Sequence, residues 1–186
     1  MPRAIRSLLT GEMHHVTARG VVRRPIFRDS ADRRRYLRTL GRQSEKVGWR
    51  CLSYCLMDNH VHLLLEGAQP DLSRGMQQLH GQYAQWFNRR HKQSGHVFQG
   101  RFHAEPVAND DHFWSTIAYV VNNPVNAGLC ASAEEWPWSS HNAVLLGEAL
   151  PWLDTRRLFA YIGDGGGDPR RIYRDFLNGV RPRLGA

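Results

Sequence analysis

Cysteines, lysines and long apolar runs are scarce in this chain of 186 residues. The three cysteines are an odd number without the spacing of a disulfide framework, so we expect a protein of the reducing cytoplasm. No apolar run approaches the roughly 20 residues that cross a bilayer, and the start, MPRAIRSLLTGEMHH, lacks the apolar core of a signal peptide. We therefore expect a soluble chain that builds one well-buried core.

The basic residues are nearly all arginines, and their excess lies in the first quarter of the chain. The sequence has 23 arginines and 2 lysines, with a formal net charge of +8. Residues 1–50 hold 13 basic and 4 acidic residues, a net of +9, whereas the remaining 136 residues hold 12 and 13, a net of −1. Because a guanidinium group matches two phosphate oxygens at once, this asymmetry favours nucleic acid as a partner over a merely solvated surface.

Hydrophobic periodicity predicts an alternation of strands and helices. We expect strands over residues 13–21, 49–57, 60–66 and 100–107, and helices over residues 30–47, 72–91 and about 110–124. The first of these helices would have Ser30 as its N-cap and Gly48 just past its end. This β-α-β-β-α-β order with one added helix is typical of the ferredoxin-like α+β fold, an antiparallel sheet with two helices on one face. The other face would be open for a site.

The C-terminal part of the sequence is less regular. Short helices are expected over residues 153–161 and after Asp168, separated by a glycine-rich joint. We therefore divide the chain into a main domain, residues 1–145, and a helical C-terminal tail, residues 146–186.

The segment LMDNHVHLLLE, residues 56–66, places two histidines in the most apolar run of the chain. Asp58 and Asn59 form a two-residue link typical of a tight hairpin. In the strand that follows, His60 and His62 point to one side, while Val61 and its apolar partners point to the other. Two imidazoles at this spacing can chelate one divalent ion. A structural role, which is usual for a lone histidine, is the alternative.

The predicted helix over 110–124 carries a tyrosine on its polar side. At roughly 100° per residue, Tyr119 lies about 200° from Ile117, which marks the buried side. Asn123 follows one turn later, and Pro124 is expected to end the helix there. A phenol and an amide thus meet at one helix end, as a nucleophile and a ligand would. The alternative is an exposed tyrosine beside a helix-terminal asparagine.

Several spaced motifs together resemble a known family. DNHVHLLL (58–65) has the His-hydrophobic-His pattern of the HUH single-strand endonucleases, and YVVNNPVNAGL (119–129) resembles a segment of the REP-associated tyrosine transposases. HHVTARG (14–20), GHVFQGRF (95–102) and WPWSS (136–140) are similar to further parts of that family. The resemblance covers about residues 10–145. One departure is Asn126, where relatives often carry a basic residue.

The resemblance implies a fold, an activity and a site. The fold would be the ferredoxin-like sheet, and the activity would be cleavage and rejoining of hairpin-bearing single-stranded DNA through a covalent 5′-phosphotyrosine. Tyr119 would be the nucleophile, and His60, His62 and Asn123 would bind Mg²⁺ or Mn²⁺. We expect a bacterial cytoplasmic, nucleoid-associated protein, and a monomer in preference to a homodimer.

The arginines of the basic region would hold the DNA backbone. The predicted DNA-binding residues are Arg19, Arg23, Arg24, Arg33, Arg34 and Arg101.

Two other functions compete with this hypothesis. A nucleic-acid-binding module without strand-transfer activity, on the same fold, would bind single strands by stacking on aromatic residues of the central strands. A zinc site of Cys51, Cys55 and the two histidines would need the cysteines to meet at one ion, although they are roughly 13 Å apart along a strand.

Overall fold

The protein is described by a computed structural model, which places residues 13–67, 69–162 and 167–179. The strands are β1 (Met13–Arg19), β2 (Arg50–Leu56), β3 (His60–Glu66) and β4 (His103–Pro106). The helices are α1 (Ser30–Val47), α2 (Gln69–His91), α3 (Asp110–Asn126), α4 (Ser140–Leu146), α5 (Thr155–Ala160) and α6 (Pro169–Leu177), with 3-10 turns η1 (Val21–Arg23) and η2 (Ala133–Glu135). Among the described residues, none of the helices is long and apolar enough to cross a membrane.

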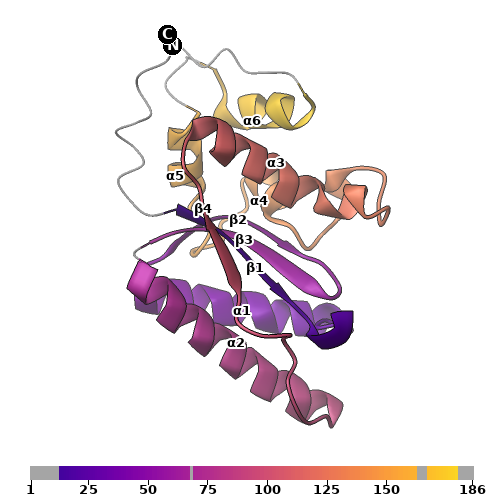
Figure 1. Cartoon of the computed structure of the whole chain (residues 1–186). Helices are drawn as coiled ribbons and strands as arrows, with labels where there is room; N and C mark the ends of the chain where they lie inside the picture. The colour runs from indigo at the N-terminus through magenta and orange to yellow at the C-terminus, as the bar shows by residue number, and fades with distance from the viewer. Residues whose placement is uncertain (1–12, 68, 163–166, 180–186) are drawn as a thin grey trace.

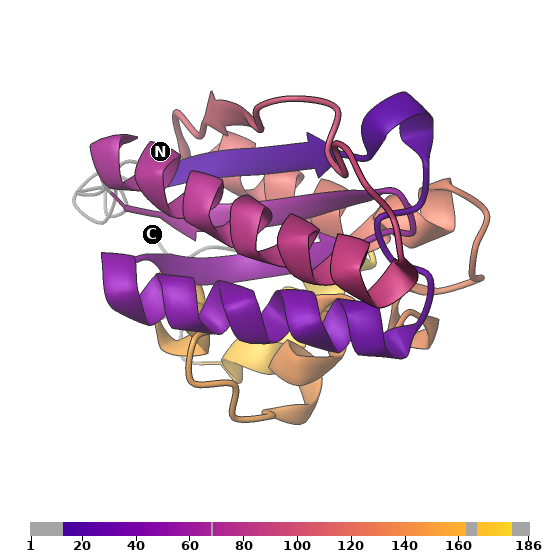
Figure 2. The same cartoon turned by 90° about the horizontal axis from the view of Figure 1, so that it is seen from below.

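The four strands form one antiparallel sheet in the order β2-β3-β1-β4. A tight link through Asp58 and Asn59 joins β2 to β3, as predicted, and the Met57 amide donates to the His60 carbonyl oxygen across it (2.9 Å). Helices α1 and α2 cover one face of the sheet side by side (Figures 1 and 2). The α+β class with a four-stranded antiparallel sheet is thus confirmed.

The other face of the sheet is not open, contrary to our expectation. Helices α3, α4 and α5 form a second layer on it, and α6 lies farther from the sheet, beyond α3 (Figure 1). Strands β2 and β3 are therefore buried along nearly their whole length, and Leu64, on the same face as the two histidines, is fully buried. Apolar residues occupy both faces of these strands, and such strands require cover on both sides.

The C-terminal helices belong to the same core as the sheet. Tyr161 and Tyr173 are buried in it, and the Arg157 guanidinium forms a two-pronged ion pair with buried Glu66 of β3 (2.6 and 2.9 Å). The Asp154 amide also donates to the Cys51 carbonyl oxygen of β2 (2.8 Å). The division at residue 145 therefore has no counterpart in the packing of the described residues.

Helix α1 is capped by Asp29, not by Ser30 as predicted. The Asp29 carboxylate accepts from the amides of Ala31 and Asp32, and a carboxylate at this position also complements the helix dipole. Gly48 ends the helix in a left-handed conformation (φ 82°), as predicted.

Helix α3 continues past Pro124, so the prediction that it ends there is wrong. A proline this close to the C-terminus removes only one hydrogen bond of the helix. The last turn is closed instead by the Ala127 amide donating to the Asn123 carbonyl oxygen (3.0 Å), and Pro124 itself is buried. Strand β4 is also shorter than predicted, since only residues 103–106 pair with β1.

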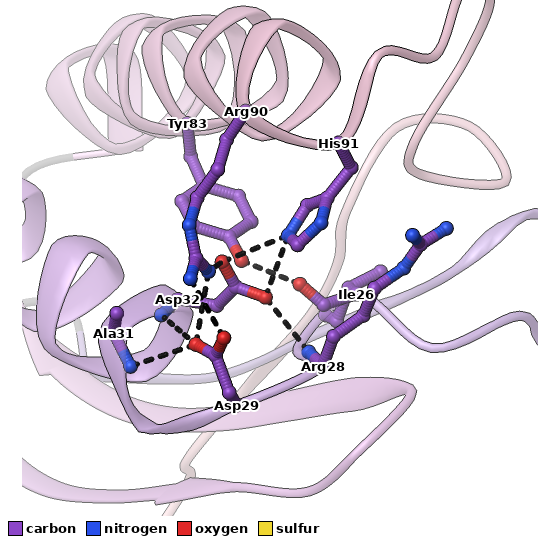
Figure 3. A network of polar contacts seen from close by, with 8 residues as sticks. All are labelled: Ile26, Arg28, Asp29, Ala31, Asp32, Tyr83, Arg90 and His91. Carbon is purple, nitrogen blue, oxygen red and sulfur yellow. Dashed lines mark hydrogen bonds and ion pairs between the residues drawn. The ribbon is translucent and has the colours of Figure 1, made fainter.

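A buried carboxylate ties the start of α1 to the end of α2 (Figure 3). Asp32 is fully buried and accepts hydrogen bonds from Arg90, from His91 (3.0 Å) and from the backbone amide of Arg28 (2.8 Å). Nearby, the Tyr83 hydroxyl donates to the Ile26 carbonyl oxygen. These contacts anchor the segment that leads from η1 into α1.

Candidate active site

Tyr119 is the exposed member of the six tyrosines, with 49% of its surface accessible. It lies on α3 against the sheet, where its ring meets the ring of His62 edge-on at a centroid distance of 5.3 Å. The other five tyrosines are buried, and burial raises the pKa of each, to about 12 for Tyr161. Tyr119 is therefore the tyrosine whose hydroxyl can reach a large substrate.

The two histidines of β3 lie together beneath Tyr119. The ring centroids of His60 and His62 are 5.0 Å apart. Nδ1 of His60 is hydrogen-bonded to Oδ1 of Asn59 (2.7 Å), and Nδ1 of His62 is hydrogen-bonded to Nε2 of His15 (3.0 Å). Nε2 of His62 is buried and has no hydrogen-bond partner among the described residues. An unpaired buried imidazole nitrogen is costly, and binding a ligand would satisfy it.

The surroundings of both histidines lower their pKa and so favour the neutral form. Burial and the neighbouring imidazoles of His60 and His15 lower the pKa of His62 to about 3. Burial and the charge of Arg19 lower the pKa of His60, although a side-chain hydrogen bond with Asn123 opposes the shift. Neutral imidazoles are the form that binds metal ions.

The donors at this point fit a hard or borderline divalent ion. The amide oxygen, with water or phosphate oxygens, suits Mg²⁺ or Mn²⁺, and imidazole nitrogen suits ions at the borderline end of this range. His60 and Asn123 are already within hydrogen-bonding reach of each other. Among the described residues, no three His, Cys, Asp or Glu side chains form a ready metal site. An ion here would therefore need Asn123 and oxygens from outside the chain.

Tyr119, His60 and His62 line a cleft of about 480 Å³. Arg19 and Arg101 also line this cleft. It shares Gly100, Arg101 and His103 with a larger groove of about 1140 Å³, which runs between α2 and the segment that leads to β4. Tyr119 and the two histidines thus open onto one continuous surface depression that Arg19 and Arg101 also line.

Comparison with known families identifies the chain at this point. The family model described as "Transposase IS200 like" matches residues 10–123, a segment that contains the paired histidines, Tyr119 and Asn123. The chain belongs to the IS200-like transposase family. The prediction of its family is thereby confirmed.

A solved structure has a similar fold. This transposase-family chain matches "Structure of the REP associates tyrosine transposase bound to a REP hairpin" with a TM-score of 0.60 and 17% sequence identity. The match covers 75% of this chain and 82% of the other. At this identity the match demonstrates a shared fold. A search of curated proteins found no match.

The predicted arginines divide into three groups in this family member. Arg19 and Arg101 line the cleft, and Arg23 and Arg24 are exposed in and beside η1. Arg33 and Arg34 lie on α1, in the helix layer across the sheet from α3 (Figure 1).

Arg33 does not fit its predicted role as a DNA contact. Its side chain is buried, forms an ion pair with Asp58 and lies over the rings of Phe27, Trp136 and Trp138. It stabilises the hairpin turn, and its guanidinium group is not presented to a phosphate.

The two competing hypotheses find little support in the structure. Cys51 and Cys55 are fully buried, and burial raises the pKa of each thiol to about 12, so neither is a thiolate ready for zinc. The central strands β1 and β3 carry histidines and no Phe, Tyr or Trp, and α3 lies over their face, which leaves no aromatic platform for stacking.

The sequence analysis missed His15 as a site residue. Its ring stacks on His62 at a centroid distance of 5.2 Å and meets Tyr119 edge-on at 5.8 Å. Alternation places His15 on one side of β1 with Thr17 and Arg19, but it does not reveal that this side is shared with His62. The antiparallel register, in which Thr17 pairs with His62, brings them together.

Proposed function

We propose that the chain is a DNA strand transferase that cleaves and rejoins hairpin-bearing single-stranded DNA through a covalent bond to Tyr119. The observation that carries this proposal is the exposed Tyr119 ring packed edge-on against His62, whose buried Nε2 has no partner among the described residues. A nucleophile and a candidate metal ligand are thus held together at the floor of a basic cleft.

The proposed cleavage step is an attack of the Tyr119 oxygen on a phosphodiester. A bond forms between this oxygen and phosphorus, and the bond from phosphorus to the 3′ oxygen of the upstream nucleotide breaks. The phenolic proton is lost, and the departing oxygen gains a proton to become a 3′-hydroxyl. A later 3′-hydroxyl can reverse the step, so strands rejoin without ATP because the phosphotyrosine retains the bond energy.

Side chains around Tyr119 prepare the cleft for this step. Arg19 and Arg101 line the cleft and can balance phosphate charge. His60, His62 and Asn123 would hold Mg²⁺ or Mn²⁺. When bound, such an ion neutralises charge on a non-bridging phosphate oxygen and polarises phosphorus.

Single-stranded DNA beside a hairpin is the substrate that the surface favours. The cleft continues into the larger groove through Gly100, Arg101 and His103, so an unpaired strand has room on both sides of the scissile phosphate. The solved relative is described as bound to a REP hairpin, and we extend this class of ligand to the present chain. The β-α-β-β-α-β order of the present chain and its strand order favour a ferredoxin-like topology. For its oligomeric state we retain the expectation of a monomer, which sedimentation can test.

The decisive experiment is a search for the covalent adduct. The full chain is incubated with Mn²⁺ and a library of labelled single strands that carry hairpins, and then resolved on a denaturing gel. We expect a shifted band that resists denaturation and disappears in Tyr119→Phe.

Tyr54→Phe is the matched control, because Tyr54 is buried on β2 and its hydroxyl cannot reach the substrate. This variant should form the adduct like the wild type. Tight hairpin binding without an adduct or cleavage under any divalent ion would overturn the enzymatic proposal. The chain would then be a DNA-binding protein that lacks strand-transfer activity.

A further inference from the structure

The turn that follows β1 contains two consecutive non-glycine residues in the left-handed region. Val22 has φ 51° and ψ 32°, and Arg23 has φ 57°. For a β-branched residue such as valine this conformation is a genuine outlier, because its side chain crowds the following carbonyl group. Backbone strain of this kind persists only where the surrounding structure imposes it, and it is concentrated at functional sites.

The surrounding structure does impose it. The Val21 amide donates to the Val97 carbonyl oxygen (3.0 Å), and the Gly20 amide donates to the Asn59 carbonyl oxygen (2.8 Å). The turn is so tight that a Cβ atom on Gly20 would lie 2.1 Å from the Arg24 carbonyl oxygen. Beyond the turn, the Ile26 amide donates to the Asp58 carbonyl oxygen (2.9 Å), so both ends of the turn are pinned to the β2–β3 hairpin.

The Val22 side chain itself is poorly packed in the described part of the chain. Its side chain is 79% exposed, the largest exposed fraction among the large apolar side chains described. A glycine would adopt this conformation without penalty and would lose no packing. The exposed valine side chain therefore adds little packing to the described part of the chain.

The turn lies beside the active site. The Asn59 side chain connects the two, because its Nδ2 donates to the Arg23 carbonyl oxygen (3.0 Å) while its Oδ1 is bonded to Nδ1 of His60 (2.7 Å). Figure 1 shows η1 at the end of β1, next to the turn between β2 and β3. Arg19, Arg23 and Arg24 flank Val22 and are exposed.

We propose that Val22 is an apolar wedge for paired DNA: it packs on the open face of the base pair at the foot of the hairpin, while the flanking arginines hold the phosphates on either side. This inference rests on the proposed function for the class of substrate. Two arginines within two residues of the valine make a nucleic-acid end a better occupant than a protein or a lipid surface, and apolar side chains are used as wedges against base steps. The wedge would set where the duplex stops, and so which phosphate enters the cleft.

The test compares Val22→Gly with the wild type in DNA binding and in stability. The variant should melt at the same or a higher temperature, because the strain is relieved. Its affinity for a hairpin-bearing strand should fall about 5-fold to 10-fold, whereas its affinity for an unpaired strand of the same composition should not change. A 2-aminopurine in the terminal base pair should change fluorescence on binding to the wild type and much less on binding to Val22→Gly.

Leu146→Ala is the matched control, because Leu146 is also an exposed apolar residue (73%) but lies at the end of α4. This variant should bind both strands like the wild type. Equal affinities of Val22→Gly and the wild type for hairpins would overturn the proposal, as would an equal loss for the unpaired strand. The affinity and fluorescence measurements require DNA binding but no cleavage. A wild type that binds hairpins without forming an adduct would therefore contradict the enzymatic proposal, and these two measurements would still test the role of Val22.

Discussion

Nε2 of His15 lies 3.0 Å from Nδ1 of His62, across 47 residues of sequence. The other histidine of β3 also has a partner on its Nδ1, since Oδ1 of Asn59 lies 2.7 Å from Nδ1 of His60. Both histidines thus have their Nδ1 engaged by a neighbour, and Nε2 of His62, which has no partner among the described residues, is left for a metal ion. Partners of this kind orient metal-binding histidines and select their tautomer.

Removal of the His15 side chain should weaken metal binding. When Nε2 of His62 binds an ion, its Nδ1 carries the proton and Nε2 of His15 accepts it. Without His15 this tautomer loses its partner, so Nε2 of His62 is less often free to bind. We expect His15→Phe to bind Mn²⁺ about 10-fold to 100-fold more weakly, the range found when such partners are lost. Electron paramagnetic resonance of free Mn²⁺ measures this without reference to activity.

His96→Phe is the control for the loss of an imidazole, since His96 is exposed and lies outside the cleft that holds Tyr119. Its Mn²⁺ affinity should equal that of the wild type. An unchanged affinity in His15→Phe would show that His15 does not position His62.

Substitutions at Asn123 should show whether its side chain binds the metal ion or has only a structural role near the end of α3. Asn123→Ala removes the oxygen donor and should lower Mn²⁺ affinity, whereas Asn123→Asp adds a charged oxygen and should raise it. Isothermal titration with Mn²⁺ measures both, and Asn122→Ala, the adjacent position, should behave as wild type. Equal affinity in all three variants would exclude Asn123 as a ligand.

The arginines of the cleft should contribute through phosphate contacts. Arg101→Ala should weaken binding of all hairpin-bearing strands and reduce the slope of log affinity against log salt by about 1, because one phosphate contact is lost. Fluorescence anisotropy between low and moderate salt gives the slope. Arg156→Ala, exposed on α5 outside the cleft, should not alter it, and a slope unaffected by Arg101→Ala would contradict the contact.

Buried histidines should make the protein sensitive to acid. His80 lies between the Tyr36 hydroxyl (3.2 Å) and the Phe98 ring, and burial lowers its pKa to about 4. In the unfolded chain its pKa is about 6.5. Between these values the unfolded state binds a proton that the folded state does not, so the free energy of unfolding decreases as the pH falls, by up to about 1.4 kcal/mol per pH unit.

Urea unfolding at pH 7 and pH 5 measures this contribution. The loss of unfolding free energy between pH 7 and pH 5 should be about 2 kcal/mol smaller in His80→Gln than in the wild type. In His96→Gln, whose imidazole is exposed, this loss should equal that of the wild type. An equal decrease in wild type and His80→Gln would show that His80 is not responsible.

Much of the fold follows from local patterns. The order of strands and helices through α3 was predictable because alternation in β1 and β3, and helical periodicity in α1, depend only on neighbours along the chain. Pro124 misled the prediction, because a proline near a helix end costs one hydrogen bond and packing of α3 on the sheet outweighs that cost. The covered second face also escaped prediction, since cover depends on where the C-terminal helices return.

The sequence by itself determined the chemistry available: a tyrosine on the polar side of a helix, Asn123 one turn later, and two histidines on one side of a strand. Only the tertiary structure decided which groups meet. It paired β1 with β3 and so placed His15 against His62, it buried Arg33 against Asp58, and it held Val22 in a strained turn beside His60. These contacts join residues far apart in the chain, and they depend on strand pairing and close packing, which local periodicity does not specify.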